Sequence, residues 1–87
     1  MRHIFLDQGW EDYSFWIDTD RTSLKRLNRL IEECGRTPYF GTGKPEALKG
    51  NWSGWWSRRL SDEHRLVYRI EGDDLIIAQC RYHYSKK

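Results

Sequence analysis

The sequence predicts an α+β fold in which two N-terminal helices pack on a mainly antiparallel sheet of four to five strands. Two stretches within the first forty residues repeat apolar side chains at helical spacing, and three later stretches alternate with the period of a strand. The chain has 87 residues, and a chain of this size buries roughly 60–65% of its unfolded surface in one modest core. We therefore expect residues 1–87 to form a single domain.

The N-terminal region predicts a short strand followed by a helix. Residues 4–6 are apolar, and Asp7 after them is a candidate N-cap for the helix. Apolar side chains then recur at three- and four-residue spacing, at Trp10, Tyr13, Trp16 and Ile17. This pattern predicts that Trp10 and Trp16 lie in the core.

A second helix is predicted to follow after a short connection. Asp18-Thr19-Asp20 interrupts the first pattern and offers a second N-cap. The apolar stripe of this helix is Leu24, Leu27, Ile31 and Cys34. Gly35 suits the position just after a helix and Pro38 forbids continuation, so we expect an end near residue 35. The short connection predicts an antiparallel helical hairpin.

The polar side of the second predicted helix carries a basic stripe of Arg21, Lys25 and Arg29. Such a stripe is usually a solvated face. Contact with RNA is the less common alternative.

The second half of the chain predicts a loop and then a meander of strands. Residues 39–54 are rich in glycine and form the expected loop, with a short strand near residues 47–49. Strand-like runs follow at residues 55–60, 64–70 and 75–82. Tight polar connections join these runs, which predicts antiparallel pairing.

The period of two assigns the side chains of these strands to two faces. Leu66, Tyr68 and Ile70 share one face. In the last strand, alternation places Ile76, Ala78, Cys80 and Tyr82 on one face, and Leu75, Ile77, Gln79, Arg81 and His83 on the other. One face is apolar enough to lie under the helices. The other is expected to collect Arg59, Arg65, Arg69, Arg81 and His83.

The cationic face indicates an anionic ligand. Residues 1–40 hold six Lys and Arg against seven Asp and Glu, whereas residues 41–87 hold nine against six. Cations on neighbouring strands repel one another, and the planar donors of arginine suit phosphate. A phosphodiester backbone is the obvious ligand, although an ordinary solvated surface is an equally common reason for such an imbalance.

A bound phosphodiester would give two further side chains a chemical role. Glu46 could take the proton of a ribose 2′-hydroxyl, and His83 or a charged arginine could assist the departing 5′-oxygen. This is metal-free transesterification, which requires RNA because DNA lacks the nucleophile. Taken alone, Glu46 and His83 are more often solvated surface residues, and Arg65 could be held in a salt bridge.

Several function classes are excluded by what the sequence lacks. No apolar run approaches the 18 or so residues of a membrane span. Neither a Gly-rich phosphate loop nor an HExxH motif is present, so we expect no metal and no organic cofactor. Cys34 and Cys80 are the only cysteines, which predicts inert packing in a reducing, cytoplasmic location.

Five sequence motifs, in order and at the expected spacing, carry a family resemblance. They are Arg36-Thr37-Pro38-Tyr39, Gly43-Lys44-Pro45-Glu46-Ala47-Leu48-Lys49, Ser53-Gly54-Trp55-Trp56-Ser57-Arg58-Arg59, Glu63-His64-Arg65-Leu66-Val67-Tyr68 and Cys80-Arg81-Tyr82-His83-Tyr84. The chain resembles the YoeB (Txe) toxins of the RelE/ParE superfamily from the first strand to Tyr84. In this sequence, unlike the common family pattern, Ser85-Lys86-Lys87 follow that tyrosine.

The resemblance implies a microbial-ribonuclease (RelE-like) fold and the toxin of a type II toxin–antitoxin system. Such a toxin would be an mRNA interferase, a metal-independent endoribonuclease that cleaves mRNA in the A site of the 70S ribosome and inhibits translation. The implied partner is a YefM-type antitoxin, through which alone operator DNA would be contacted. Family precedent favours a homodimer, but the sequence itself leaves the oligomeric state and the codon preference open.

The resemblance also implies a role for six residues. The catalytic residues would be Glu46 as general base, Arg65 as transition-state stabiliser, His83 as general acid and Tyr84 as a stacking or orienting group. Lys49 and Arg59 would hold phosphate. The alternative is a ParE-like toxin that blocks a protein target without nuclease activity. Its relatives lack the Glu, Arg and His set, so Glu46, Arg65 and His83 argue against it.

Overall fold

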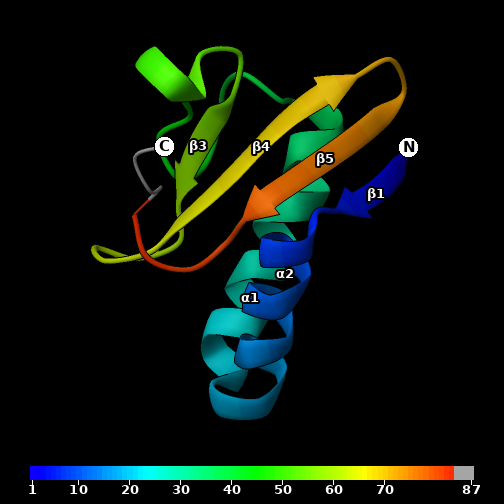
Figure 1. The fold of residues 1–87 in the computed structure, drawn as a ribbon. Helices are drawn as coiled ribbons and strands as arrows, with labels where there is room; N and C mark the ends of the chain where they lie inside the picture. The colour runs from blue at the N-terminus through cyan, green and yellow to red at the C-terminus, as the bar shows by residue number, and fades with distance from the viewer. Residues whose placement is uncertain (84–87) are drawn as a thin grey trace.

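The computed structural model describes residues 1–83 and contains two α-helices and a five-stranded sheet (Figure 1). Its elements are, in chain order, β1 (Arg2–Phe5), α1 (Asp7–Thr19), α2 (Arg21–Arg36), β2 (Glu46–Ala47), a short 3₁₀ helix η1 (Gly50–Trp52), β3 (Trp56–Arg59), β4 (Arg65–Glu71) and β5 (Asp74–Gln79). The predicted α+β architecture is confirmed. Within residues 1–83, no helix is long and apolar enough to cross a membrane.

The sheet has the strand order β1-β5-β4-β3-β2. The meander from β3 to β5 is antiparallel as predicted, and β2 pairs antiparallel with β3. In contrast, β1 lies parallel to β5, with Arg2 opposite Asp74 and Phe5 opposite Ile77. The sheet is therefore mixed, because the two helices carry the chain from β1 back to the start of the meander.

The two helices form the predicted hairpin, but their ends differ in part from the prediction. Asp20 caps α2, because its side chain accepts a 3.1 Å hydrogen bond from the N–H of Ser23. Asp7 does not cap α1: it is the first helical residue, and Leu6 occupies the cap position without a side-chain hydrogen bond. The second helix ends at Arg36, which confirms the predicted end near residue 35, but Gly35 lies inside the helix and not just after it.

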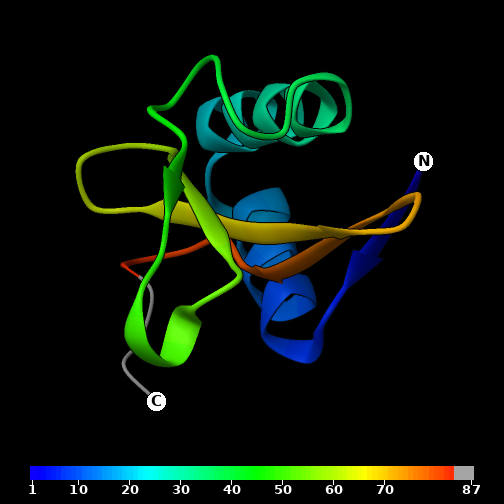
Figure 2. The same ribbon diagram turned by 90° about the horizontal axis from the view of Figure 1, so that it is seen from above.

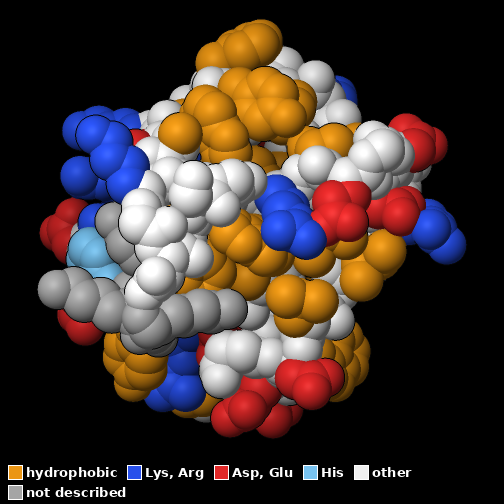
Figure 3. Space-filling view, turned by 45° about the horizontal axis from the view of Figure 1, so that its top comes forward, with side chains coloured by type: hydrophobic (Ala, Val, Ile, Leu, Met, Phe, Trp, Pro, Cys, Tyr) orange, Lys and Arg blue, Asp and Glu red, His pale blue; other side chains and the backbone are white. Residues whose placement is uncertain are grey.

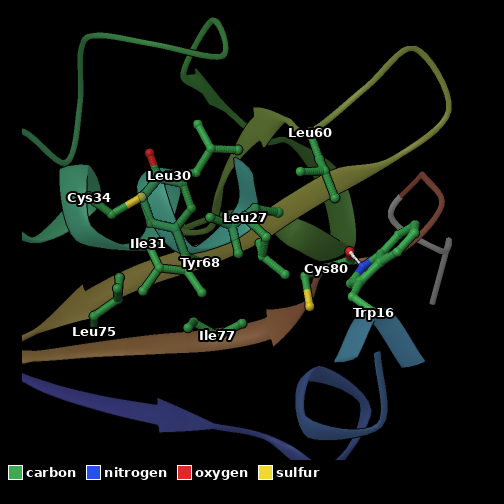
Figure 4. Packing of buried hydrophobic residues seen from close by; sticks show 11 residues of the cluster. Trp16, Leu27, Leu30, Ile31, Cys34, Leu60, Tyr68, Leu75, Ile77 and Cys80 are labelled. Carbon is green, nitrogen blue, oxygen red and sulfur yellow. Dashed lines mark hydrogen bonds between the residues drawn. The ribbon is translucent and has the colours of Figure 1, made fainter. Parts of the chain in front are cut away.

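The main core lies between the sheet and the helices (Figure 4). It contains Trp16, Leu27, Leu30, Ile31, Cys34, Leu60, Leu66, Tyr68, Leu75, Ile77 and Cys80. A smaller cluster of Leu48, Trp52, Val67 and Ala78 packs on the opposite face of the sheet. Figure 2 accordingly shows α2 on one side of the sheet and η1 on the other. Both cysteines are buried, as predicted.

The prediction that Trp10 lies in the core is wrong. The buried positions of α1 are Gly9, Asp12 and Trp16, so Trp10 points away from this face and is 56% exposed. Its ring stacks on Tyr13 instead. A polar residue at the centre of the buried face concealed the true stripe, because Asp12 does not count as apolar in a periodicity pattern.

The strict alternation predicted for the last strand is also wrong, because β5 contains a bulge. Val67 pairs with Gln79 and Tyr68 pairs with Ile77, which leaves Ala78 as an extra residue. Such a bulge shifts the side-chain alternation of the strand beyond it. Cys80 therefore joins Ile77 in the main core, while Ala78 lies in the cluster on the other face.

Candidate functional site

A cross-strand row of side chains defines the face of the sheet opposite to α2. Glu46 lies opposite Ser57, Ser57 opposite Val67, and Val67 opposite Gln79. Directly opposed residues of an antiparallel pair share a face. Because Val67 belongs to the smaller cluster, this row places Glu46 on the same face as that cluster.

Two of the predicted cations lie on this face beside the row. Arg59 on β3 is directly opposite Arg65 on β4, and these residues are two positions along from Ser57 and Val67. Arg59 is exposed, whereas only 8% of Arg65 is accessible. The fold thus brings the predicted base, Glu46, to the same face as both arginines.

The guanidinium of Arg65 is fixed by the loop between β3 and β4. Its Nη1 donates to the carbonyl oxygens of Ser61 at 2.7 Å, His64 at 3.0 Å and Asp62 at 3.1 Å. Among residues 1–83, Nε and Nη2 of Arg65 make no hydrogen bond, and its side chain forms no salt bridge. One nitrogen therefore orients the group, while two others retain N–H donors that suit an anion.

The segment that carries His83 is tied to α1 at Cys80. The N–H of Cys80 donates to Oδ2 of Asp12 at 3.0 Å. Its carbonyl accepts from Nε1 of Trp16 at 2.9 Å, a bond that Figure 4 shows. Both peptide groups of a single residue are thus held by buried side chains of one helix. This arrangement fixes the direction in which the chain leaves β5.

The same segment is tied to β4 at Tyr82. The N–H of Arg65 donates to the carbonyl of Tyr82 at 2.9 Å, and the N–H of Tyr82 donates to Nδ1 of His64 at 2.7 Å. Gln79 completes the attachment, because its Nε2 donates to the carbonyl of His83 at 3.2 Å. The strand end with Arg65 and the segment with His83 are thereby adjacent. Tyr84 lies outside the described residues.

The remaining predicted cations take different positions. Lys49 is exposed at the start of η1, next to Leu48 of the smaller cluster on the sheet face that carries Glu46. Arg69 pairs with Glu71 and lies 4.4 Å from the ring centroid of Trp55. Arg81 lies 3.5 Å above the ring of Phe15 on α1, so its expected place on a continuous cationic sheet face is wrong. The bulge in β5 accounts for this change of direction.

The surface at the candidate site is polar and open. Among residues 1–83, the side chains of Glu46, Lys49 and Arg59 have no ion-pair partner. Figure 3 shows Lys and Arg side chains and a histidine gathered at one edge of the face that it presents. A hollow of about 180 Å³ adjoins the segment that carries His83. It is lined by Gln8, Asp12, Gln79, Arg81, Tyr82 and His83.

Arg58 supports the site from beneath, by organising the loop that precedes Glu46. Its guanidinium is fully buried and pairs with the carboxylate of Glu33. It also donates to the carbonyl oxygens of Thr37, Phe40 at 3.0 Å and Thr42 at 3.2 Å. The connection between α2 and β2 is therefore fastened to a side chain of β3.

Burial and hydrogen bonding set the protonation of the groups around Arg58. Burial raises the pKa of Tyr68 to about 12 and that of the Cys34 thiol to about 11. The N–H of Thr42 lowers the pKa of Glu33, and Arg58 lowers it further. Glu33 is thus ionised and Tyr68 is neutral at physiological pH, so the carboxylate of Glu33 is the anionic partner of Arg58.

Sequence reasoning did not identify the supporting residues Asp12, His64 and Gln79. A signal existed only for Arg58, because it stands between Trp56 and Leu60 on an apolar strand face and a buried cation needs an anionic partner. The roles of His64 and Gln79 depend on the path of the chain after β5, which no local spacing encodes. Among residues 1–83, no group of His, Cys, Asp and Glu is arranged to hold a metal ion.

The sequence of this chain is similar to those of known proteins. A family model described as "YoeB-like toxin of bacterial type II toxin-antitoxin system" matches residues 5–84. Toxin YoeB of Streptomyces coelicolor is 56% identical over 84 residues, and Toxin YoeB of Escherichia coli (strain K12) is 52% identical over 84 residues. Each alignment covers 97% of this chain and 100% of the relative.

Solved structures of similar proteins have the same fold. A YoeB/ParE toxin from Agrobacterium tumefaciens superimposes with a TM-score of 0.93 at 46% identity, covering 97% of this chain and 100% of that one. YoeB in the heterotetrameric YoeB–YefM complex from Staphylococcus aureus gives a TM-score of 0.89 at 40% identity, with 97% and 98% coverage. A YoeB dimer from the same organism gives the same TM-score, identity and coverage.

Proposed function

Because the chain belongs to the YoeB-like toxins of bacterial type II toxin–antitoxin systems, we propose that it is a ribosome-dependent, metal-independent endoribonuclease. It cleaves mRNA in the ribosomal A site and thereby inhibits translation. The observation that carries this proposal is the shared sheet face of Glu46, Arg59 and Arg65, together with the attachment of the His83 segment beside Arg65.

The reaction is an internal transesterification of RNA. The carboxylate of Glu46 takes the proton of a ribose 2′-hydroxyl, and the 2′-oxygen forms a bond to the adjacent phosphorus. The bond from phosphorus to the 5′-oxygen breaks, and His83 gives a proton to that oxygen. The products are a 2′,3′-cyclic phosphate and a 5′-hydroxyl, so atoms and charges balance without a metal ion.

Arg65 stabilises the extra negative charge that develops on the phosphoryl oxygens. Its donors are oriented in advance by the loop carbonyls that hold Nη1, and preorganised donors are the main source of such stabilisation. Lys49 and Arg59 bind the flanking phosphates. Tyr84 would stack on or orient the substrate, according to the family motif.

Partners are proposed by analogy with the related complexes. The Staphylococcus aureus toxin is seen with YefM in a heterotetramer and also as a dimer. We expect residues 1–87 to act as one domain that a YefM-type antitoxin neutralises, with homodimerisation of the toxin and with operator DNA reached only through the antitoxin. The site in this chain is the natural target of neutralisation, since covering it blocks RNA entry.

A ParE-like toxin that blocks a protein target is the second candidate. It is favoured by the similarity to a protein described as a YoeB/ParE toxin. Nothing in that mode of action needs a carboxylate and two arginines on one open sheet face. A DNA-damage response without mRNA cleavage after induction would identify it.

Primer extension on a defined mRNA, with and without programmed 70S ribosomes, tests the proposal. The wild-type chain is compared with Glu46→Gln, which keeps the size of the side chain and removes the base. A cut in the A-site codon that requires both the ribosome and Glu46 supports the proposal. Cleavage without ribosomes overturns the ribosomal partner, and translation arrest without any cleavage overturns the nuclease activity.

A further inference from the structure

The helix α2 carries a group of cations that have no partner in the fold. These cations are Arg21, Lys25, Arg26 and Arg29, all exposed. Among residues 1–83, their side chains form no hydrogen bond and no ion pair. Other surface cations are paired, such as Arg2 with Asp74 and Arg36 with Glu32. Within residues 1–83, the other cations without an ion pair lie mainly in the candidate site and its flanking loop.

The exposed cations lower the stability of the helix that carries them. Arg21, Lys25 and Arg29 are four residues apart, so neighbouring charges repel by about 0.2–0.5 kcal/mol for each pair. Arg21 also lies in the first turn of the helix, where the macrodipole disfavours cations. No acidic residue lies between positions 21 and 31. A binding role for the exposed charges would explain why the helix carries them.

The position of the cations separates them from the candidate site. The buried positions of α2 are Leu27, Leu30, Ile31 and Cys34, so the exposed cations point away from the sheet. Glu46 and its companions lie on the far face of the sheet, where Figure 2 shows η1. A short RNA bound for cleavage cannot reach both surfaces. An anionic ligand of the α2 cations would therefore be distinct from the RNA bound for cleavage.

The chemistry of this surface indicates which polyanion it is. Every exposed position of α2 is polar, whereas protein partners are usually anchored by apolar or aromatic side chains. Residues four apart on a helix are displaced by about 6 Å along its axis, a spacing comparable to that of successive phosphates in an RNA strand. The surface thus fits a sugar–phosphate backbone better than a peptide.

We propose that Arg21, Lys25 and Arg29 of α2, flanked by Arg26, bind the phosphodiester backbone of ribosomal RNA while mRNA occupies the opposite face of the sheet. This inference rests on the proposed ribosome-dependent function and adds the surface by which the ribosome holds the toxin. The toxin is then clamped between two RNA surfaces, one for docking and one for cleavage.

Ribosome binding across a salt series tests the proposal. The Glu46→Gln background keeps the mRNA intact, and in it Lys25→Gln/Arg29→Gln is compared with Arg2→Gln/Arg36→Gln. Both double variants remove two positive charges, but only the first changes the α2 group. Each phosphate contact adds about 0.9 to the slope of log affinity against log salt concentration. One contact therefore accounts for about a 3.5-fold loss of affinity between 50 and 200 mM salt. The α2 variant would lose two such contacts. We therefore expect its affinity to fall by roughly tenfold less than that of the control variant over this salt range.

The outcomes separate this proposal from the proposed function. Equal binding by the two double variants overturns the inference, as does loss of antitoxin neutralisation in the α2 variant with unchanged ribosome affinity. If the Glu46→Gln parent does not bind ribosomes at all, the proposed function falls. A duplex RNA oligonucleotide then decides the inference: binding that needs Lys25 and Arg29 sustains it, and binding that does not overturns it.

Discussion

The peptide N–H of Tyr82 donates a 2.7 Å hydrogen bond to Nδ1 of His64. Tyr82 has a φ of +59°, a left-handed conformation that costs a non-glycine residue of order 1 kcal/mol. The ring of His64 is itself fixed edge-on against Trp16, with 4.8 Å between the ring centroids. The residue just before His83 is thus kept in a strained conformation by a half-buried imidazole that packs against the core residue Trp16.

Replacement of His64 tests whether this bond positions the catalytic segment. Asn can present an acceptor near the place of Nδ1, whereas Phe keeps the ring and removes the acceptor. We expect His64→Phe to lower the single-turnover cleavage rate by about tenfold to a hundredfold, since small misplacements near reacting groups cost this much. His64→Asn should retain most of the activity.

A second measurement separates positioning by His64 from general destabilisation. Hydrogen exchange of the Tyr82 amide should be slow in the wild type and in His64→Asn, and fast in His64→Phe. If His64→Phe cleaves RNA at the wild-type rate, the imidazole does not position the segment.

Arg65 is expected to contribute to catalysis through the shape of its guanidinium as well as its charge. We expect Arg65→Ala to reduce the rate of cleavage by about 10²–10³, the usual effect of losing one anion-stabilising donor. Arg65→Lys keeps the charge but lacks the planar set of donors, so it should recover only part of the rate. Full activity in Arg65→Lys under single-turnover conditions would mean that charge alone suffices.

Much of the fold could be predicted because it follows from local chemistry. Asp20 caps α2 through Ser23, as the interruption of the apolar pattern suggested. The polar turns between the last three strands produced the antiparallel meander. The placement of Glu46 with Arg59 and Arg65 depends on the pairing of β2 with β3, whereas the sequence pattern put Glu46 in the loop before a short strand near residues 47–49.

The predictions that were wrong concern places where segments distant in the sequence meet. The bulge at Ala78 lets the chain turn from β5 toward α1, and nothing within residues 75–83 encodes it. The buried carboxylate of Asp12 holds Cys80, so the core face of α1 is partly polar and periodicity misassigned Trp10. Long-range hydrogen bonds of this kind are invisible to patterns that sort residues by hydrophobicity alone.

Gly9 allows the close approach of α1 to β5 that these contacts require. A Cβ at this position would lie 2.5 Å from the carbonyl oxygen of Ile77. We expect Gly9→Ala to destabilise the protein by about 1–3 kcal/mol in urea unfolding, because backbone atoms must move apart. Gly35→Ala is the control, since its Cβ would meet only Sδ of Met1 at 3.5 Å. It should be neutral or stabilising by up to about 1 kcal/mol.

The ion pair between Arg58 and Glu33 is expected to be essential for folding stability. Arg58→Met leaves the carboxylate and several loop carbonyls without their donor, and breaking such a pair costs about 3–5 kcal/mol. Arg36→Met, which breaks the exposed pair with Glu32, should cost less than about 1 kcal/mol. Similar losses for the two variants in urea unfolding would show that the Arg58 network contributes little.

The same network predicts how stability depends on pH. The pKa of Glu33 in the folded protein is lowered from its ordinary value of 4.5, first by the N–H of Thr42 and also by Arg58. A carboxyl group whose pKa is lower in the folded protein stabilises the fold at pH values above its pKa in the unfolded chain. That stabilisation is lost as the pH falls through its pKa in the folded protein. The unfolding free energy of the wild type should therefore decrease below about pH 4.5.

Glu33→Gln isolates this contribution from other carboxylates. The pKa of Asp20 is lowered by Ser23 and that of Asp74 by Arg2. Protonation of these two groups therefore lowers the unfolding free energy at acid pH equally in the wild type and in the variant. We expect Glu33→Gln to be less stable than the wild type at pH 7 and to lose less on acidification. The two curves from urea unfolding between pH 7 and pH 3 should therefore converge. Parallel curves would mean that protonation of Glu33 is not coupled to folding, and that Arg58 is held by its carbonyl acceptors alone.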